Sequence, residues 1–215
     1  MSAAVVVFDL DGTLTLRDTS LPFLRLAAGR RATRSALLAA GAWALPDLAA
    51  SLWAERPGPR PRVGGVSGRW EGRLHERMIA RTLRGRSRVE LEEAARRFAD
   101  LTLAENLRAD ARGRIEEHRN RGHRLVLASA SLEICLEPLR EGLGLDVAVG
   151  TRLEFVEAVS TGRVLGLPCW GAEKLRRVRE AVGTDGEIAY AYGNGRGDRA
   201  VMAAARHGIV VRPVR

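Results

Sequence analysis

The stretch Ala3–Thr13, AAVVVFDLDGT, is the part of the sequence that indicates most about the fold. Its first half is a run of β-branched and aromatic residues without charge, which is typical of a buried strand. The run ends at Asp9, and the Asp-Gly pair at Asp11 and Gly12 indicates a turn. Side chains repeat every second residue along an extended chain, so the two carboxylates are expected on one side of it.

Downstream of this stretch, predicted helices and strands alternate. The hydrophobic patterns predict helices over 105–122, 131–144, 172–183 and 198–208, and strands over 123–129, 146–151, 187–195 and 209–214. Residues 150–159 and 161–167 are expected to form a small antiparallel flap. The alternation predicts an α/β fold, a doubly wound parallel sheet with helices on both faces.

The first strand is separated from this alternating region by a long helical segment. Helical spacing of apolar residues extends from about residue 21 to 107, interrupted by a Pro- and Gly-rich loop at 55–70. We therefore predict an α/β core formed by residues 1–16 and 105–215. Residues 17–104 are predicted to form a helical cap inserted after the first strand.

The chain is strongly basic, with a formal net charge of +9, and 34 of its 35 basic residues are arginine. A basic chain attracts phosphorylated metabolites, nucleic acid or acidic lipid. Aromatic residues are only 5% of the chain and are not interleaved with basic ones, so we expect no nucleic-acid partner. The one lysine, Lys174, is retained either by chance or because a slender ammonium is required there.

The sequence gives little indication of a disulfide, a metal-binding cysteine pair or a membrane-spanning segment. Cys135 and Cys169 lack metal-ligand spacing and suggest no disulfide framework. The apolar run at 35–54 is broken by Pro46 and Asp47, and neither half reaches the ~20 residues that span a bilayer. We expect a cytoplasmic protein. The run, which includes Trp43, leaves peripheral contact with an anionic membrane as an open alternative.

Polar residues follow several of the predicted strands. In a parallel sheet, ligands bind at the carboxyl ends of the strands. The residues expected at this edge are Asp9, Asp11, Gly12, Thr13, Ser129, Ser131, Asn194 and Asp198, with Lys174 at the start of the preceding helix. Acids, an amide, a hydroxyl and one ammonium together suit phosphoryl transfer: one carboxylate attacks phosphorus and the other moves the proton. Mg²⁺ and the ammonium would neutralise the opposing charges.

Four segments resemble the signature motifs of the haloacid dehalogenase (HAD) superfamily of phosphohydrolases. They are FDLDGTLT at 8–15, LVLASAS at 125–131, GAEK at 171–174 and YGNGRGD at 192–198. The helical insertion is similar to the C1-type cap of the phosphoserine-phosphatase-like branch, subfamily IB. Further likeness at 11–25, 161–166 and 169–174 is to a set that includes uncharacterised bacterial hydrolases and phosphatidylglycerophosphatases of the C type. Only residues 32–86 carry no motif of the family.

The resemblance implies a role for each site residue. Asp9 would be the nucleophile, Asp11 the general acid and base, and Lys174 the bridge between Asp9 and the phosphate. The implied Mg²⁺ ligands are Asp9, the backbone carbonyl of Asp11, Asn194 and Asp198. The implied phosphate- and substrate-binding residues are Thr13, Ser129, Ala130 and, on the cap side, Asp18. The family usually has aspartate where this chain has Asn194, which predicts weaker metal affinity.

The function implied is Mg²⁺-dependent hydrolysis of a phosphate monoester through an aspartyl phosphate. The substrate is a small metabolite phosphate, phosphoserine-like, or a lipid phosphate. Two alternatives stay open: a non-hydrolytic phosphate-binding or regulatory protein, suggested by Asn194, and a phosphotransferase. Ser131 is expected to cap the next helix, whereas Cys169 and Trp170 either line the pocket or pack in the core. The sequence does not indicate an oligomeric state.

Overall fold

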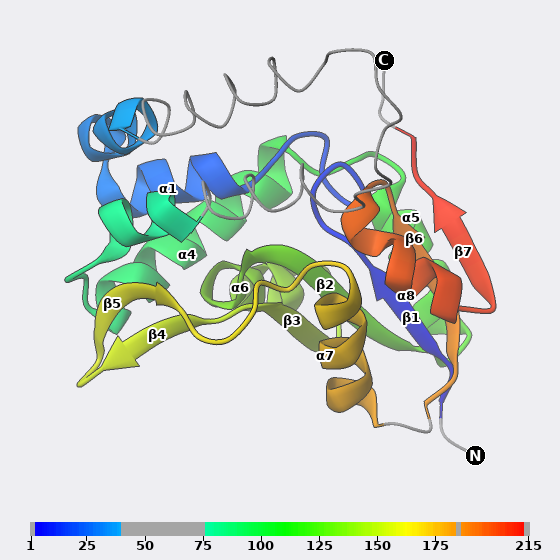
Figure 1. Ribbon diagram of the computed structural model, residues 1–215. Helices are drawn as coiled ribbons and strands as arrows, with labels where there is room; N and C mark the ends of the chain where they lie inside the picture. Colours follow the sequence, from blue (N-terminus) through cyan, green and yellow to red (C-terminus); the bar gives the residue numbers. More distant parts are fainter. Residues whose placement is uncertain (1–2, 40–75, 184–185, 213–215) are drawn as a thin grey trace, which may run out of the picture.

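A five-stranded parallel sheet forms the centre of the computed structural model, which describes residues 3–39, 76–183 and 186–212 (Figure 1). The strands lie in the order β3-β2-β1-β6-β7. Their bounds are β1 Val5–Phe8, β2 Arg124–Leu132, β3 Val147–Thr151, β6 Ile188–Gly193 and β7 His207–Val210. A separate antiparallel pair, β4 Leu153–Val156 and β5 Val159–Val164, confirms the predicted flap.

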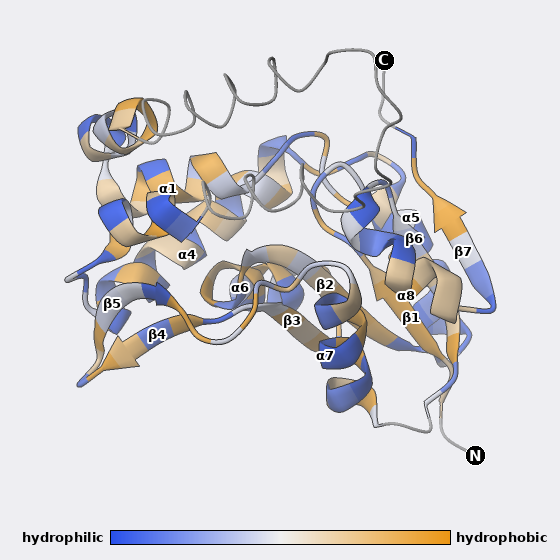
Figure 2. Cartoon of the chain, viewed as in Figure 1, coloured by the Kyte–Doolittle hydropathy of each residue, from blue (hydrophilic) through white to orange (hydrophobic). Residues whose placement is uncertain are grey.

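Helices cover both faces of the sheet, as predicted. Their bounds are α1 Ser20–Ala28, α4 Arg88–Glu105, α5 Ala111–Asn120, α6 Glu133–Leu143, α7 Ala172–Val182 and α8 Arg199–Ala204, with a short 3₁₀ turn, η1, at Arg196–Asp198. Val6 and Phe8 of β1 pack with α5 and α6, whereas Val5 and Val7 pack with α7 and α8. Figure 2 shows β1 as hydrophobic and α7 as largely hydrophilic on its visible side. The alternation within β1 thus places one helical layer on each face.

Several predicted boundaries were wrong. The helix predicted to start at residue 105 starts at Ala111, because residues 106–108 pair with the chain that leaves β1: Leu16 N–H donates to the Asn106 carbonyl and Arg108 N–H to that of Leu14. The last strand starts at His207 rather than residue 209, and α8 ends early, at Ala204. There β7 pairs with β6, and this pairing replaces the helical pattern seen in the sequence.

The helical insertion after β1 packs directly on the core. Besides α1 and α4, residues 30–39 and 76–83 are helical. The helix α4 begins at a capping box in which Ser87 and Glu90 satisfy each other's backbone N–H groups. Phe23 of α1 and Phe98 of α4 meet edge to face and belong to the same hydrophobic cluster as α6. The described helices of the insertion therefore share a continuous core with the α/β sheet.

The insertion leaves and re-enters the core at one place. Arg17 N–H donates to the side-chain oxygen of Asn106, and the Asn106 amide donates to the Arg17 carbonyl. The division of the chain at residues 17 and 104 stays a prediction. Among the described residues, no helix combines the length and the apolar character needed to cross a bilayer. The predicted loop at 55–70, Trp43 and most of the apolar run lie outside the described residues.

Candidate active site

The polar residues predicted for the sheet edge do come together there. Asp9 directly follows β1, Ser129 and Ser131 lie in the last part of β2, and Asn194 directly follows β6. β1 lies between β2 and β6: after β1 the chain adds β2 and β3 on one side of it, and later β6 and β7 on the other. Such a switch point is where open α/β sheets bind ligands.

Lys174 is the centre of the site. Its Nζ lies 2.9 Å from Oδ1 of Asp9 and 2.6 Å from Oδ1 of Asp198, and the residue is 3% exposed. Burial opposes the ammonium form, but the charges of Asp9 and Asp198 outweigh burial and raise the pKa of Lys174. The ammonium is therefore permanently charged and held between two carboxylates.

The carboxylate of Asp9 is held on both oxygens. Lys174 donates to Oδ1, and the Thr13 hydroxyl donates to Oδ2 at 3.0 Å. Burial raises the pKa of Asp9, while the adjacent ammonium lowers it in part. Thr13, predicted to bind phosphate, thus directly orients the predicted nucleophile.

Asp11 lies between the core and the start of the insertion. Its Oδ1 accepts the Thr19 N–H at 2.7 Å, and its Oδ2 accepts the hydroxyls of Ser131 at 3.1 Å and Ser129 at 3.4 Å. Burial, with a further contribution from the charge of Asp18, raises the pKa of Asp11 to about 6. A carboxyl group with this pKa can give and take a proton near neutral pH.

Ser131 is a site residue whose role the sequence did not reveal. The expectation that it caps the following helix was wrong, because Leu132 occupies the N-cap position of α6 and Ser131 still belongs to β2. Its hydroxyl contacts Asp11 and lies 3.4 Å from the hydroxyls of Thr19 and Ser20. The strand continues three residues beyond the predicted end at residue 129, and this turns Ser131 toward the site.

Asn194 and Asp198 form a loop against β1. The Asn194 side-chain amide donates to the Asp11 backbone carbonyl at 2.6 Å, and Oδ2 of Asp198 accepts the N–H groups of Asn194 and Gly195. A Cβ on Gly12, whose φ is +73°, would lie 2.2 Å from the Asn194 amide, so the close approach requires glycine. Both oxygens of Asp198 are already engaged, one by Lys174 and one by the loop.

The donor set fits Mg²⁺ by its chemistry. Among the described residues there is no cluster of three His, Cys, Asp or Glu side chains that could hold a metal. The predicted set instead combines carboxylates with the Asp11 backbone carbonyl and the Asn194 side chain, which the 2.6 Å contact brings together. Oxygen donors of this kind suit Mg²⁺, which retains several waters. These four ligand assignments stay predictions.

Two further predicted residues lie at the periphery. The Asp18 carboxylate is exposed and accepts the N–H groups of Ser20 and Leu21, at the start of α1. The carbonyl of Ala130 accepts the Thr151 hydroxyl at 2.6 Å.

Cys169 and Trp170, just before α7, were expected either to line the pocket or to pack in the core. Cys169 is fully buried, whereas Trp170 is half exposed. Cys135 and Cys169 are both buried free thiols.

Comparison with known proteins identifies the family of the chain. The family model of haloacid dehalogenase-like hydrolases matches residues 6–203. Protein CicA of Caulobacter vibrioides is 32% identical over 205 residues, which cover 94% of this chain and 82% of CicA. A phosphoserine phosphatase of Archaeoglobus fulgidus is 30% identical over 139 residues, 63% of this chain and 38% of that protein.

A solved structure shares the fold across nearly the whole chain. It is a Bordetella pertussis protein described as of unknown function, with a TM-score of 0.69 at 21% identity, covering 95% of this chain and 87% of that one. The four motifs, the sheet order and the family match agree with one another. The chain belongs to the haloacid dehalogenase-like hydrolases, with the phosphoserine-phosphatase-like arrangement that its motifs resemble.

Proposed function

We propose that this protein is a Mg²⁺-dependent phosphatase that cleaves a phosphate monoester through an aspartyl phosphate on Asp9. The observation that carries the proposal is the buried Lys174 ammonium, which lies 2.9 Å from one oxygen of Asp9. Attack of a carboxylate on a phosphate brings two anions together, and a fixed cation beside the nucleophile offsets that repulsion. The family match and the likeness to a phosphoserine phosphatase support the same reaction class.

In the first step a carboxylate oxygen of Asp9 attacks phosphorus, and the bond between phosphorus and the ester oxygen breaks. Asp11 enters this step protonated and gives its proton to the leaving oxygen, so an alcohol departs. The pKa of about 6 at Asp11 keeps a useful protonated fraction near neutral pH. Ser129 and Ser131 orient the acid from the core side.

In the second step Asp11, now a carboxylate, takes a proton from water. The water oxygen attacks phosphorus, and the bond between phosphorus and the Asp9 oxygen breaks. Inorganic phosphate leaves, Asp9 regains its carboxylate and Asp11 its proton. Lys174 pairs with Asp9 throughout, and Asp198 keeps the ammonium in place.

A bound Mg²⁺, held by Asp9, the Asp11 carbonyl, Asn194 and Asp198, would supply further positive charge at the phosphoryl group. Thr13, Ser129 and Ala130 would surround the phosphoryl oxygens, and Asp18 would face the substrate from the segment just before α1. Residues 17–104 would act as the cap that excludes bulk water and selects the leaving group. The partner is therefore a phosphorylated small molecule.

The test is phosphate release from p-nitrophenyl phosphate, with and without Mg²⁺. We expect release that requires Mg²⁺ and is abolished in Asp9→Asn. Asp100→Asn makes the same chemical change at an exposed position on α4 and should leave the rate unchanged. Full activity of Asp9→Asn would overturn the proposal. Absence of release from the wild type across a panel of phosphate monoesters would instead favour a phosphate-binding protein without turnover.

A further inference from the structure

The segment between β5 and α7, residues 165–171, is called the rim loop here. It has the sequence LGLPCWG and contains no charged residue, in a chain of which 28% is charged. Three of its large apolar side chains face solvent: Leu165 is 53% exposed, Leu167 66% and Trp170 47%. Single exposed apolar residues are common, but three within six residues beside a candidate active site form a patch.

The rim loop is held in place by a buried arginine. Arg177, on α7, donates from one terminal nitrogen to the Leu167 carbonyl at 2.7 Å and from the other to the Gly150 carbonyl at 2.5 Å. Its Nε donates to Glu173 at 2.8 Å, and Arg177 is itself buried. This planar fork ties the loop to the end of β3.

A second buried contact holds the other half of the loop. The Thr151 hydroxyl accepts the Cys169 N–H at 3.0 Å and donates to the Ala130 carbonyl at 2.6 Å. Thr151 and Cys169 are both fully buried. Two polar clamps thus fix the backbone of a loop whose apolar side chains remain in water, and a fixed backbone presents those side chains in one arrangement.

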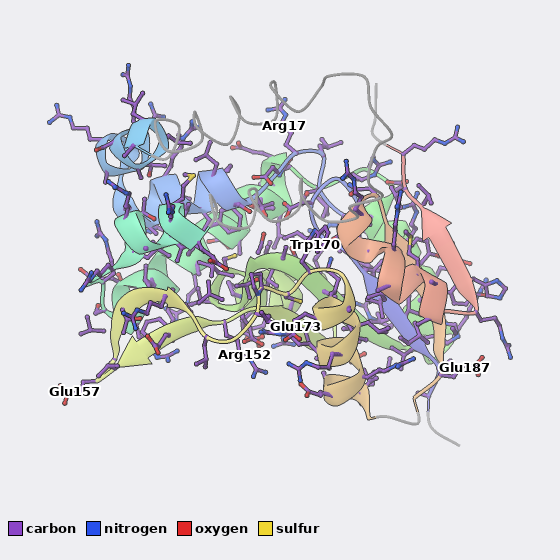
Figure 3. All side chains as sticks on the ribbon, viewed as in Figure 1. Arg17, Arg152, Glu157, Trp170, Glu173 and Glu187 are labelled. Atoms are coloured by element: carbon purple, nitrogen blue, oxygen red, sulfur yellow. The ribbon has the colours of Figure 1, made fainter. Side chains whose placement is uncertain are left out.

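Trp170 places this patch next to the phosphoryl site. A Cβ on Gly197 would lie 2.7 Å from Cδ1 and Nε1 of the indole, so the ring packs directly on the Gly197 backbone. The Gly197 carbonyl also accepts the Gly171 N–H at 2.9 Å. Gly197 immediately precedes Asp198, which holds Lys174. Figure 3 shows Trp170 near the middle of the view, between α7 and the loop that leads to α8.

We propose that Trp170 is a specificity-determining residue, and that the rim loop binds an apolar leaving group of the phosphate monoester. This inference rests on the proposed phosphatase function. With the phosphoryl group at Asp9 and Lys174, the alcohol part of the substrate extends over the rim, where the indole and Leu167 offer apolar contact area. Alcohols with an alkyl chain or ring next to the phosphate gain from this contact, whereas zwitterionic ones such as phosphoserine do not.

The experiment compares kcat/KM for ethyl, butyl and hexyl phosphate and for phosphoserine. In the wild type kcat/KM should rise along the alkyl series. Trp170→Ala should lower kcat/KM for hexyl phosphate about tenfold or more and leave ethyl phosphate and phosphoserine nearly unchanged, since contact with a few methylenes has about this effect. Trp170→Phe keeps an aromatic ring and should restore most of the preference.

The matched control is Val156→Ala. Val156 is 60% exposed at the tip of the β4–β5 hairpin, beside Glu157, which Figure 3 places far from Trp170. This variant should retain the wild-type alkyl series. Thermal unfolding of each variant establishes that it is folded.

The outcomes separate the two proposals. A uniform fall of kcat/KM across all four substrates in Trp170→Ala, or a flat alkyl series in the wild type, would overturn the role of the rim loop and leave the phosphatase function standing. A wild type that hydrolyses none of the four substrates and no p-nitrophenyl phosphate would overturn both.

Discussion

Lys174 and Asp9 are 165 residues apart in the sequence, and the Nζ of one lies 2.9 Å from Oδ1 of the other in the buried centre of the site. In a chain whose other basic residues are all arginine, this contact gives a physical reason for the one lysine. A guanidinium is broad and planar and does not fit where a thin stem must reach between Asp9 and Asp198.

Lys174→Arg should therefore lose activity although it keeps the charge. We expect kcat to fall about 100-fold or more, the effect typical of a displaced electrostatic group in an active site. Phosphate release from p-nitrophenyl phosphate measures it, and Arg176→Lys, an exposed change on the same helix, is the control. Equal rates for Lys174→Arg and the wild type would show that the site needs only a charge.

Lys174→Met should destabilise the fold as well. It leaves the buried carboxylates of Asp9 and Asp198 without their cation, and removing one partner of a buried ion pair costs about 3–5 kcal/mol. Urea unfolding at neutral pH gives the change in the free energy of unfolding. A variant as stable as the wild type would mean that the pair contributes nothing to the fold.

Asp11→Asn should remove activity and raise stability. The pKa of Asp11 is raised from 3.8 to about 6, so the folded protein binds more protons than the unfolded chain between these values. Ionisation of Asp11 therefore destabilises the fold progressively as pH rises from about 4 to 6, and the full penalty, about 2–3 kcal/mol, remains at pH 7.

The asparagine has no charge to desolvate and escapes this penalty. Thermal unfolding in EDTA at pH 7 should give a higher midpoint for Asp11→Asn than for the wild type, and the two midpoints should converge near pH 4. A lower midpoint for Asp11→Asn at pH 7 would contradict the raised pKa of Asp11 and the penalty for its ionisation.

Asn194→Asp should increase Mg²⁺ affinity. The change adds one negative charge beside the Asp11 carbonyl, at a position where the present amide donates a hydrogen bond at 2.6 Å. Titration calorimetry with Mg²⁺ should show Kd lowered about tenfold, which corresponds to roughly 1.4 kcal/mol. An unchanged Kd would remove Asn194 from the metal ligands.

Acid should lower the stability of the fold through His118, which lies on the face of the sheet opposite α7. His118 is buried, with Nδ1 2.9 Å from Nδ1 of His123 and Nε2 2.8 Å from the Tyr192 hydroxyl. Burial, with a further contribution from His123, lowers the pKa of His118. The unfolded chain therefore binds a proton more readily, and stability should fall as pH drops below about 6.5.

His118→Gln should flatten this pH dependence. The glutamine lacks a titrating group yet can still hydrogen-bond to Tyr192. Unfolding midpoints at pH 7 and pH 5 should differ less in this variant than in the wild type. The same difference in both proteins would assign the acid sensitivity to other groups.

The sequence predicted the alternation of strands and helices along the chain well, because β1 and β6 are continuous apolar runs that end at polar residues. It could not place the start of α5, since the amphipathic pattern continues through residues 105–110 and the helix is interrupted by the pairing of residues 106–108 with the chain that leaves β1. Tertiary contact of this kind overrides local pattern.

The same limit applies to the site. Asp9, Asp11 and Lys174 stand out by motif, whereas Ser131 contacts Asp11 only because β2 extends to Leu132. The exposed indole of Trp170 depends on its packing against Gly197, which is distant in sequence and adjacent in space. A pattern of residue types does not report such contacts.

The central claim is that Asp9 carries the phosphoryl group, and acid-quench peptide mass spectrometry tests it most directly. Asp11→Asn treated with p-nitrophenyl phosphate and Mg²⁺ is the suitable protein, because p-nitrophenolate leaves without an acid while the second step lacks its base. We predict a phosphoryl group on the peptide that contains Asp9, and none in the double variant Asp9→Asn/Asp11→Asn. Burst release of p-nitrophenol with no phosphoryl group on Asp9, or with one on another residue, would contradict the account.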